Sequence, residues 1–171
     1  MTIRRTLRTI ATLLALSAAT TPATTLGAQE AGLAIGTKAP TPALQTLDGK
    51  PASLATAVGK GPVLIEFWAT WCPSCKELEP RLLAAQKKYA GKVQFVAVAV
   101  GVNQSAALVN KYVQKHGLTG ITHLYDATGA AAEAFDVPAT SHVVVLDRTG
   151  KVVYTGTGGT QDLEAAIRKA L

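Results

Sequence analysis

The stretch Phe67-Trp68-Ala69-Thr70-Trp71-Cys72-Pro73-Ser74-Cys75 decides the fold, and it holds the chain's only two cysteines and both of its tryptophans. A C-x-x-C pair can form and break a disulfide without a large backbone movement. As a purely structural cross-link it would contribute only about 2 kcal/mol, because the loop it closes is so short. A zinc site needs four ligands, and the three histidines, His116, His123 and His142, lack the close spacing of a zinc motif. The pattern therefore favours redox chemistry over a structural bridge or a metal site.

The first 28 residues have the pattern of a secretory signal peptide rather than of a folded segment. A basic start with Arg4, Arg5 and Arg8 precedes an apolar run, residues 10–19, that is too short to span a bilayer comfortably. Small residues follow, and Leu26-Gly27-Ala28 is a candidate cleavage site. The arginine pair also matches the start of a twin-arginine signal, but Arg8 falls where an apolar pair is expected. We therefore favour general secretion.

This pattern divides the chain into three parts. Residues 1–28 are predicted to be a signal peptide, residues 29–38 a lead-in, and residues 39–171 one domain with a core of normal size. Export would place the protein in the periplasm or another extracytoplasmic compartment, either released after cleavage or held by an uncleaved anchor. Disulfides persist in such compartments.

The charge of the chain gives no sign of a nucleic-acid partner. The formal net charge is +6, but the first 28 residues hold three of the 17 basic residues and none of the 11 acidic ones, so about +3 remains for the rest. Lys87, Lys88 and Lys92 cluster near one helix end without interleaved arginines and aromatic residues. We expect a solvated helix face there, no nucleic-acid binding, and a monomer.

Segments with strand and helix periodicity alternate after the lead-in. Strands are predicted at 43–47, 63–69, 93–100, 122–125, 142–146 and 152–155. Helices are predicted at 73–90, 103–116, 130–135 and 162–171. This alternation, with a terminal hairpin around the turn at 147–151, indicates an α/β sandwich around a mixed sheet.

Several stretches resemble the thioredoxin superfamily. Residues 65–76 resemble its active-site signature, and Pro80 matches the proline that kinks its first active-site helix. Val137-Pro138-Ala139-Thr140 resembles its cis-proline loop. The extra strand-helix unit before that loop, with the export signal, is similar to the TlpA/ResA branch of extracytoplasmic disulfide reductases. The resemblance covers about residues 39–171. It implies a thioredoxin-like three-layer sandwich, in which helices flank a mixed central sheet and the extra unit precedes the cis-proline loop.

The helix expected at Pro73 suggests a division of labour between the cysteines. Cys72 would lie at the mouth of this helix, near unpaired backbone N–H groups and the positive end of the helix dipole, both of which favour the thiolate. Cys75 would lie one turn deeper, as the more buried, resolving thiol. Cys72 would then form the mixed disulfide with a client, and Cys75 would release the product and close the ring.

Glu66 is the second chemical feature, and with Ser141-His142 it departs from the TlpA/ResA pattern. Relatives often have an aromatic residue and a leucine where this chain has Ser141-His142. At the position of Glu66 an asparagine is common in the branch. Glu66 instead resembles the buried acid of thioredoxin. A lone acid in an apolar strand is costly to ionise, so we expect a raised pKa for Glu66 and proton exchange with Cys75. The ordinary alternative is a Glu66 that reaches solvent or forms an ion pair.

The resemblance also implies a substrate-binding surface. Trp71 would flank the exposed sulfur, while Pro73 suits the first helical turn, where no N–H donor is missed. A cis bond before Pro138 would hold Val137 and Ala139 against the nucleophilic sulfur and offer a client peptide a backbone edge. Only about one X-Pro bond in twenty is cis, so the cis expectation rests on the family position.

These features predict an exported protein thiol–disulfide oxidoreductase, and we favour a reductase because the resembled branch is reductive. Its partners would be protein disulfides or thiols and a membrane thiol-disulfide relay as electron donor, with no cofactor and no bound metal. Cytochrome c maturation is one candidate client pathway, and general repair is another. Two rivals are a copper-delivery protein, for which His142 is the candidate third ligand, and a thiol peroxidase, whose cysteine motif is absent here.

Overall fold

The computed structural model describes residues 31–171. The expected signal peptide, residues 1–28, and the start of the lead-in therefore lie outside the described residues. Within residues 31–171, no helix combines the length and the apolar character that crossing a bilayer requires.

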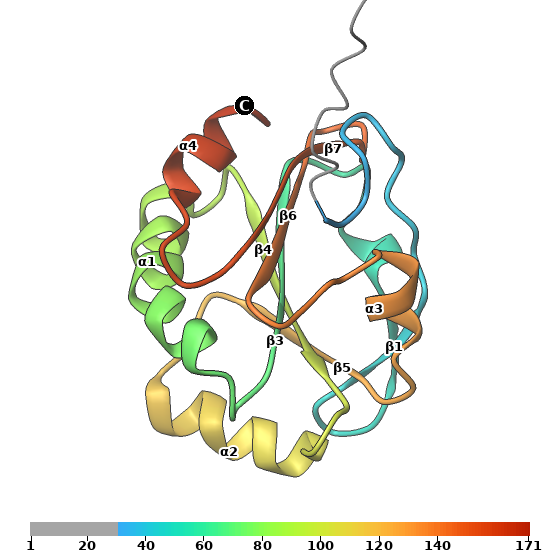
Figure 1. The fold of residues 1–171 in the computed structure, drawn as a ribbon, viewed down its shortest axis with the longest axis vertical. Coiled ribbons are helices and arrows are strands. Elements are labelled where there is room, and N and C mark those ends of the chain that lie inside the picture. Colours follow the sequence, from blue (N-terminus) through green and yellow to red (C-terminus); the bar gives the residue numbers. More distant parts are fainter. Residues whose placement is uncertain (1–30) are drawn as a thin grey trace, which may run out of the picture.

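A seven-stranded mixed sheet forms the centre of the molecule (Figure 1). Its strands, in chain order, are β1 (Ala43–Thr46), β2 (Pro51–Ser53), β3 (Val63–Trp68), β4 (Gln94–Val100), β5 (Thr122–Asp126), β6 (His142–Leu146) and β7 (Val152–Thr157). The spatial order is β2-β1-β5-β4-β3-β6-β7. The strands β3, β4 and β5 are parallel to one another, whereas β6 runs antiparallel to β3, and the other neighbouring pairs are also antiparallel. The strand β3 therefore lies between a parallel and an antiparallel neighbour.

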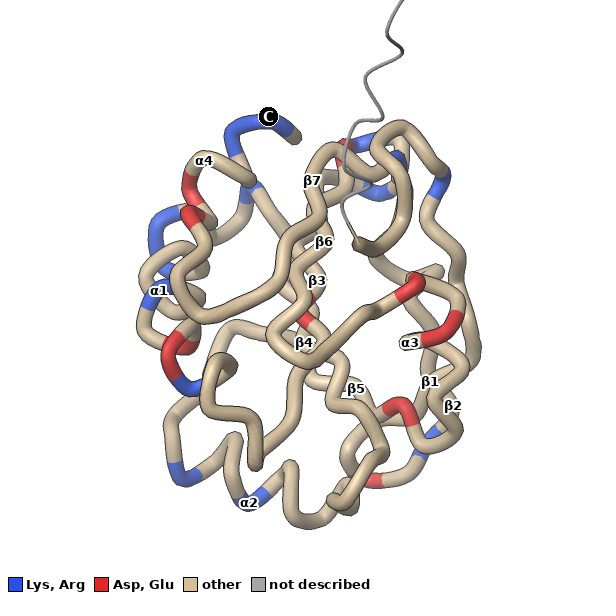
Figure 2. The backbone as a smooth tube through the Cα atoms, viewed as in Figure 1, with Lys and Arg blue, Asp and Glu red and all other residues tan. Residues whose placement is uncertain are grey.

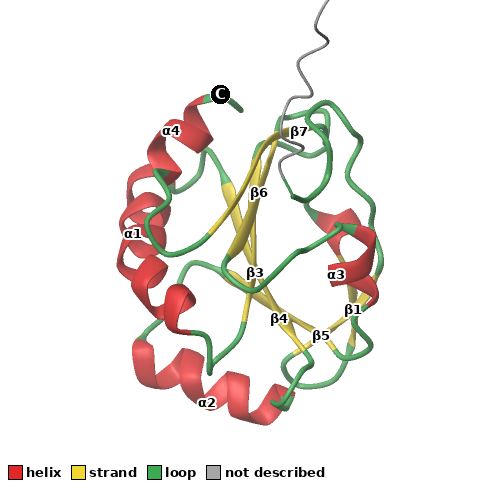
Figure 3. Cartoon of the chain, viewed as in Figure 1, coloured by secondary structure: helices red, strands yellow, loops and turns green. Residues whose placement is uncertain are grey.

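Helices cover both faces of this sheet (Figure 3). They are α1 (Pro73–Tyr89), α2 (Ala106–His116), α3 (Ala130–Ala134) and α4 (Leu163–Arg168), with a short 3₁₀ helix at Leu54–Thr56. The apolar side chains of α1, α2 and α4 pack in one core cluster, and those of the 3₁₀ helix and most of those of α3 pack in another. This arrangement confirms the predicted three-layer α/β sandwich of thioredoxin type, with a strand-helix unit, β5 and α3, inserted before β6.

Side chains along β3 alternate between the two clusters, as the two-residue period of a strand requires. Leu64 and Trp68 face the cluster under α1, and Ile65 and Phe67 face the other. Every residue of β3 is buried, because helices cover both faces of the central parallel strands. Charged residues lie mainly on the helices and loops (Figure 2), so Glu66 in β3 is unusual in its surroundings.

The predicted boundaries differ from the observed ones mainly where a loop has its own geometry. The helix predicted from residue 103 begins at Ala106, because Asn103 has a positive φ of 54° and Ser105 caps the helix by accepting a hydrogen bond from Leu108 N–H. This helix ends at Gly117, whose φ of 62° favours a residue without a Cβ. The strand β2 was not predicted, since its three residues include Pro51 and show no alternation.

Candidate active site

The cysteine pair lies where β3 passes into α1. Cys72 is the N-cap of α1 and has an extended backbone, and Pro73 takes the first helical position. The two cysteines form a disulfide with a Cα–Cα distance of 5.3 Å. The Sγ of Cys72 also accepts a hydrogen bond from the backbone N–H of Cys75 at 3.1 Å and lies 3.3 Å from the Ser74 hydroxyl. These groups, together with the dipole of a 17-residue helix, favour negative charge on Cys72 once the disulfide opens.

The relative burial of the two cysteines differs from the prediction. In this oxidised structure Cys72 is 1% exposed and Cys75 is 5% exposed, so Cys72 is not the more accessible sulfur. The disulfide directs the Cys72 sulfur back over the first turn of α1, where it contacts Ser74 and Cys75. The predicted difference between them would therefore rest on position, at the cap and inside the helix, rather than on exposure in the oxidised state.

Trp71 is 44% exposed beside this pair, and its indole N–H donates to the carbonyl of Val102 at 2.8 Å. Pro73 is also exposed. An exposed apolar ring is thus held in position next to the disulfide. This placement agrees with the predicted position of Trp71 and Pro73 at the site.

Gln104 holds the segment before the cysteines in place, and sequence reasoning missed it. Its side-chain oxygen accepts hydrogen bonds from both the backbone N–H and the hydroxyl of Thr70, each at 2.9 Å. Its amide nitrogen donates to the carbonyl of Val100 at 2.6 Å. The loop after β4 is thereby tied to the loop after β3. No sequence pattern indicates this contact, because it joins residues 34 positions apart.

Glu66 is buried in β3, on the same face as Leu64 and Trp68. Burial raises the pKa of Glu66 to about 8, with a further contribution from the negative charge of Glu79. The carboxyl group therefore holds a proton over much of the neutral range. The predicted rise in pKa agrees with this, and the alternative of a Glu66 that reaches solvent does not.

A small, largely buried cavity of about 10 Å³ is lined by both Glu66 and Cys75. Its titratable lining residues are Glu66, Cys75, Glu79 and His123. Trp68, Leu82, Ala97, Leu118 and Ile121 complete the walls. A volume of this size is about the least that holds one water molecule. The structure thus brings the buried acid and the inner cysteine to the same space.

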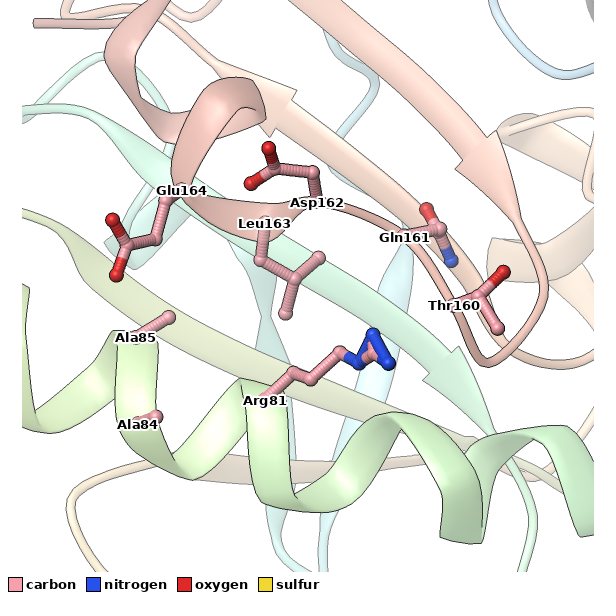
Figure 4. A pocket seen from close by; sticks show the side chains of 8 residues that line it. All are labelled: Arg81, Ala84, Ala85, Thr160, Gln161, Asp162, Leu163 and Glu164. Carbon is pink, nitrogen blue, oxygen red and sulfur yellow. The ribbon is translucent and has the colours of Figure 1, made fainter.

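A second hollow, of about 300 Å³, lies between α1 and the chain that leads into α4 (Figure 4). Arg81 extends into it from α1, opposite Gln161 and Asp162. Neither cysteine and no predicted site residue lines this groove. The larger hollow is therefore separate from the redox chemistry.

The predicted cis-proline loop is where the structure corrects the sequence analysis. Residues 31–171 contain no cis peptide bond, so Val137–Pro138 is trans, as most X-Pro bonds are. The chain turns instead at Asp136 and Ser141, which have positive φ values of 50° and 66°. The Val137 N–H is occupied by the carbonyl of Ala132 at 2.9 Å.

Ser141, rather than Pro138, is the residue that lies against the end of β3. Its N–H donates to the carbonyl of Phe67 at 2.8 Å, and its own carbonyl accepts from Gly158 N–H and from the side chain of Gln161, each at 3.0 Å. Pro138 and Ala139 lie three and two residues earlier and are exposed. Val137 packs against the cluster under α3, on the sheet face opposite the cysteines. No hydrogen bond in the described part of the chain joins these three residues to Cys72.

His142 lies on that same opposite face. The imidazole is fully buried beside Phe67, its Nδ1 is 2.9 Å from the Thr157 hydroxyl, and a Cβ on Gly32 would come within 2.7 Å of the ring. The sheet separates this ring from both sulfurs, so a copper site made from the two cysteines and His142 does not fit this structure. Residues 31–171 contain no group of three metal-binding side chains.

Comparisons with known proteins agree with this geometry. A profile described as Redoxin matches residues 34–171. The chain is 34% identical to the thioredoxin-like protein YneN of Bacillus subtilis over 146 residues, which is 84% of each chain. It is 32% identical to the thiol-disulfide oxidoreductase ResA of the same organism over 72% of this chain and 67% of that one. Among solved structures, a thiol:disulfide interchange protein of Chlorobium tepidum is similar with a TM-score of 0.66 and 28% identity, over 80% of this chain and 97% of that one.

Proposed function

Because the chain belongs to the redoxin family and is a protein thiol–disulfide oxidoreductase of the ResA type, we propose that it acts as an exported disulfide reductase. The observation that carries the proposal is the disulfide at the start of α1, with Cys75 and Glu66 lining the same small cavity. The signal-like residues 1–28 support export. Protein disulfides are the proposed substrates, and a monomer is the proposed working form.

In the reductive direction the reduced protein begins the reaction through Cys72. The Cys72 thiolate attacks a client disulfide, forms a mixed disulfide with one client sulfur, and expels the other as a thiolate. In the fraction of molecules in which Glu66 is ionised, the Cys75 thiol then transfers its proton to Glu66 while its sulfur attacks Cys72. The second client thiolate leaves with the electron pair of the broken bond, and the Cys72–Cys75 disulfide remains.

The oxidised protein must then be reduced, and a dithiol relay held in the membrane is the proposed donor. That exchange runs the same steps in reverse, so two electrons enter and Glu66 returns the proton to Cys75. Trp71 and Pro73 are proposed to contact both the client and the donor, because they are exposed next to the disulfide. The exposed residues Pro138 and Ala139, with the half-buried Val137 before them, are proposed as an outer part of that surface, with a trans bond at Pro138.

The direction of electron flow can be tested by measuring the reduction potential. Thioredoxin-like couples range from about −270 mV for a reductant to about −120 mV for a strong oxidant. We expect equilibration with glutathione or dithiothreitol buffers to give a value near the reducing end, together with reduction of insulin disulfides. A potential near −120 mV would instead assign the protein to disulfide formation.

The division of labour can be tested by trapping clients. With Cys75→Ser, mixed disulfides between Cys72 and client proteins should accumulate, because no thiol resolves them. With Cys72→Ser, trapping should nearly vanish. Non-reducing gels of the two variants, expressed in the same cells, measure the difference. Equal trapping by both would contradict the assignment of attacking and resolving thiols.

A further inference from the structure

Glu79 lies between the small cavity beside Cys75 and the protein surface. It lies on α1 one turn after Cys75 and lines the cavity with Cys75 and Glu66. Its two oxygens are bound on the outer side, one accepting from the Tyr112 hydroxyl at 3.0 Å and the other lying 3.1 Å from His116 Nδ1. The Glu79 side chain is 21% exposed and that of His116 is 32% exposed. One carboxylate thus touches both the buried space and groups in contact with water.

The chemistry of the site requires such a link. Each turnover delivers the Cys75 proton to Glu66, and Glu66 has to lose this proton before it can accept another. Glu66 itself is buried, so the proton needs a path to solvent. A cavity with room for about one water molecule can supply the first step of that path.

His123 is the remaining titratable side chain on the cavity wall, and it does not lead outward. Its Nε2 lies 2.9 Å from the carbonyl of Leu118, which can only accept, and its Nδ1 is buried without a partner. Burial lowers the pKa of His123. A proton placed on this ring would have no further group to move to, so Glu79 is the remaining outlet among the residues that line the cavity.

We propose that Glu79 passes protons between the cavity and solvent, and so couples the Glu66–Cys75 step to bulk water. This inference rests on the proposed function. As the Cys75–Cys72 bond forms, the thiol proton goes to Glu66, then through a cavity water to the Glu79 carboxylate, and leaves by His116 or directly into water. During reduction of the disulfide the same groups carry one proton inward. Tyr112 donates to Glu79 and holds the carboxylate in place, so Tyr112 is a positioning residue.

A purely electrostatic role for Glu79 makes a different prediction. The groups facing Glu79 are Glu66 on β3, Cys75 on its own helix, His123 on β5, and Tyr112 and His116 on α2. If only the charge mattered, removing it would lower the pKa of Glu66 and shift the pH profile of the release step downward, without lowering its plateau. If Glu79 conducts protons, the plateau itself should fall.

The test is a stopped-flow reaction of the reduced protein with Ellman's reagent across pH, in H₂O and D₂O. Two thionitrobenzoate anions are released, the first by attack of Cys72 and the second by ring closure through Cys75. Glu79→Gln should leave the first phase unchanged, lower the plateau of the second about 10-fold, and increase its solvent isotope effect. Glu79→Asp, which keeps a carboxylate, should restore part of the rate.

Glu77→Gln is the matched control, because Glu77 is an exposed acid on the same helix and its loss removes the same charge. It should leave both phases unchanged. A plateau for Glu79→Gln within twofold of that for Glu77→Gln, with only a shifted midpoint, would overturn the proton path. A wild-type protein that gives no second phase would instead overturn the dithiol chemistry on which the path depends, so the two failures are distinguishable.

Discussion

A carboxyl group in the middle of a buried strand has an unfavourable free energy of burial, and in Glu66 this burial changes the pKa. Transferring an ionised carboxylate from water to a site without a partner is strongly unfavourable, so the group keeps its proton and its pKa rises to about 8. A base with a pKa in this range is well matched to a thiol, because proton transfer between groups of similar pKa has little free energy to overcome. In the proposed mechanism, the unfavourable burial of Glu66 therefore serves the resolving cysteine.

Replacing Glu66 by Gln tests this role, since the amide keeps the shape and removes the titrating proton. We expect ring closure through Cys75 near neutral pH to slow by about 10- to 100-fold, at or below the usual general acid–base contribution. Attack by Cys72 should keep its rate, and the stability of the fold should stay level or increase. The two phases with Ellman's reagent separate these effects. Unchanged rates across pH would leave Glu66 a packing residue only.

At the scale of elements, the buried strands and long helices were predictable from the sequence, and the loops that connect them were not. The run VLIEFW and the stretch after Pro73 have one clear periodicity each, so β3 and α1 were placed within about one residue. The loop before β6 depends on Ser141, whose positive φ and backbone hydrogen bonds involve distant partners. A proline three positions earlier was the stronger local signal, and it indicated the wrong residue.

Gln104 lies in one of these loops, and its contribution to stability can be measured. Gln104→Leu would leave the N–H and hydroxyl of Thr70 and the carbonyl of Val100 without partners in a partly buried setting. We expect a loss of about 1–3 kcal/mol in the free energy of unfolding, and a higher KM for client proteins because the Trp71 segment is freed. Gln114→Leu is the control, as this side chain is exposed on α2 and bonds only Asn110. Equal denaturation midpoints for the two variants would show that the hydrogen bonds of Gln104 do not stabilise the fold.

Across the whole molecule, the sheet separates two kinds of buried titratable group. Glu66, Cys75 and His123 share the cavity on the face under α1, and His142 lies on the other face beside Phe67. Burial lowers the pKa values of His123 and His142 below 6.5, outweighing the opposing influence of the Leu118 carbonyl on the first and of Asp136 on the second. These histidines bind protons in the unfolded chain before they do so in the folded one. Their contribution to stability is therefore complete above pH 6.5 and is lost as the pH falls below it.

Glu66 has the opposite effect on the pH dependence of stability, so the fold is predicted to become less stable as the pH rises. Its pKa is near 4.5 when unfolded and about 8 when folded, so between these values the folded state holds one more proton. The free energy of unfolding should then decrease as the pH rises toward 8, by up to about 1.4 kcal/mol per pH unit. Urea denaturation of the disulfide form at pH 6.5, 7.5 and 8.5 measures this slope without titrating cysteines. Glu66→Gln should flatten it, while Glu77→Gln should retain it. If the wild-type protein and Glu66→Gln have parallel pH profiles, Glu66 is already ionised in the folded protein near neutral pH.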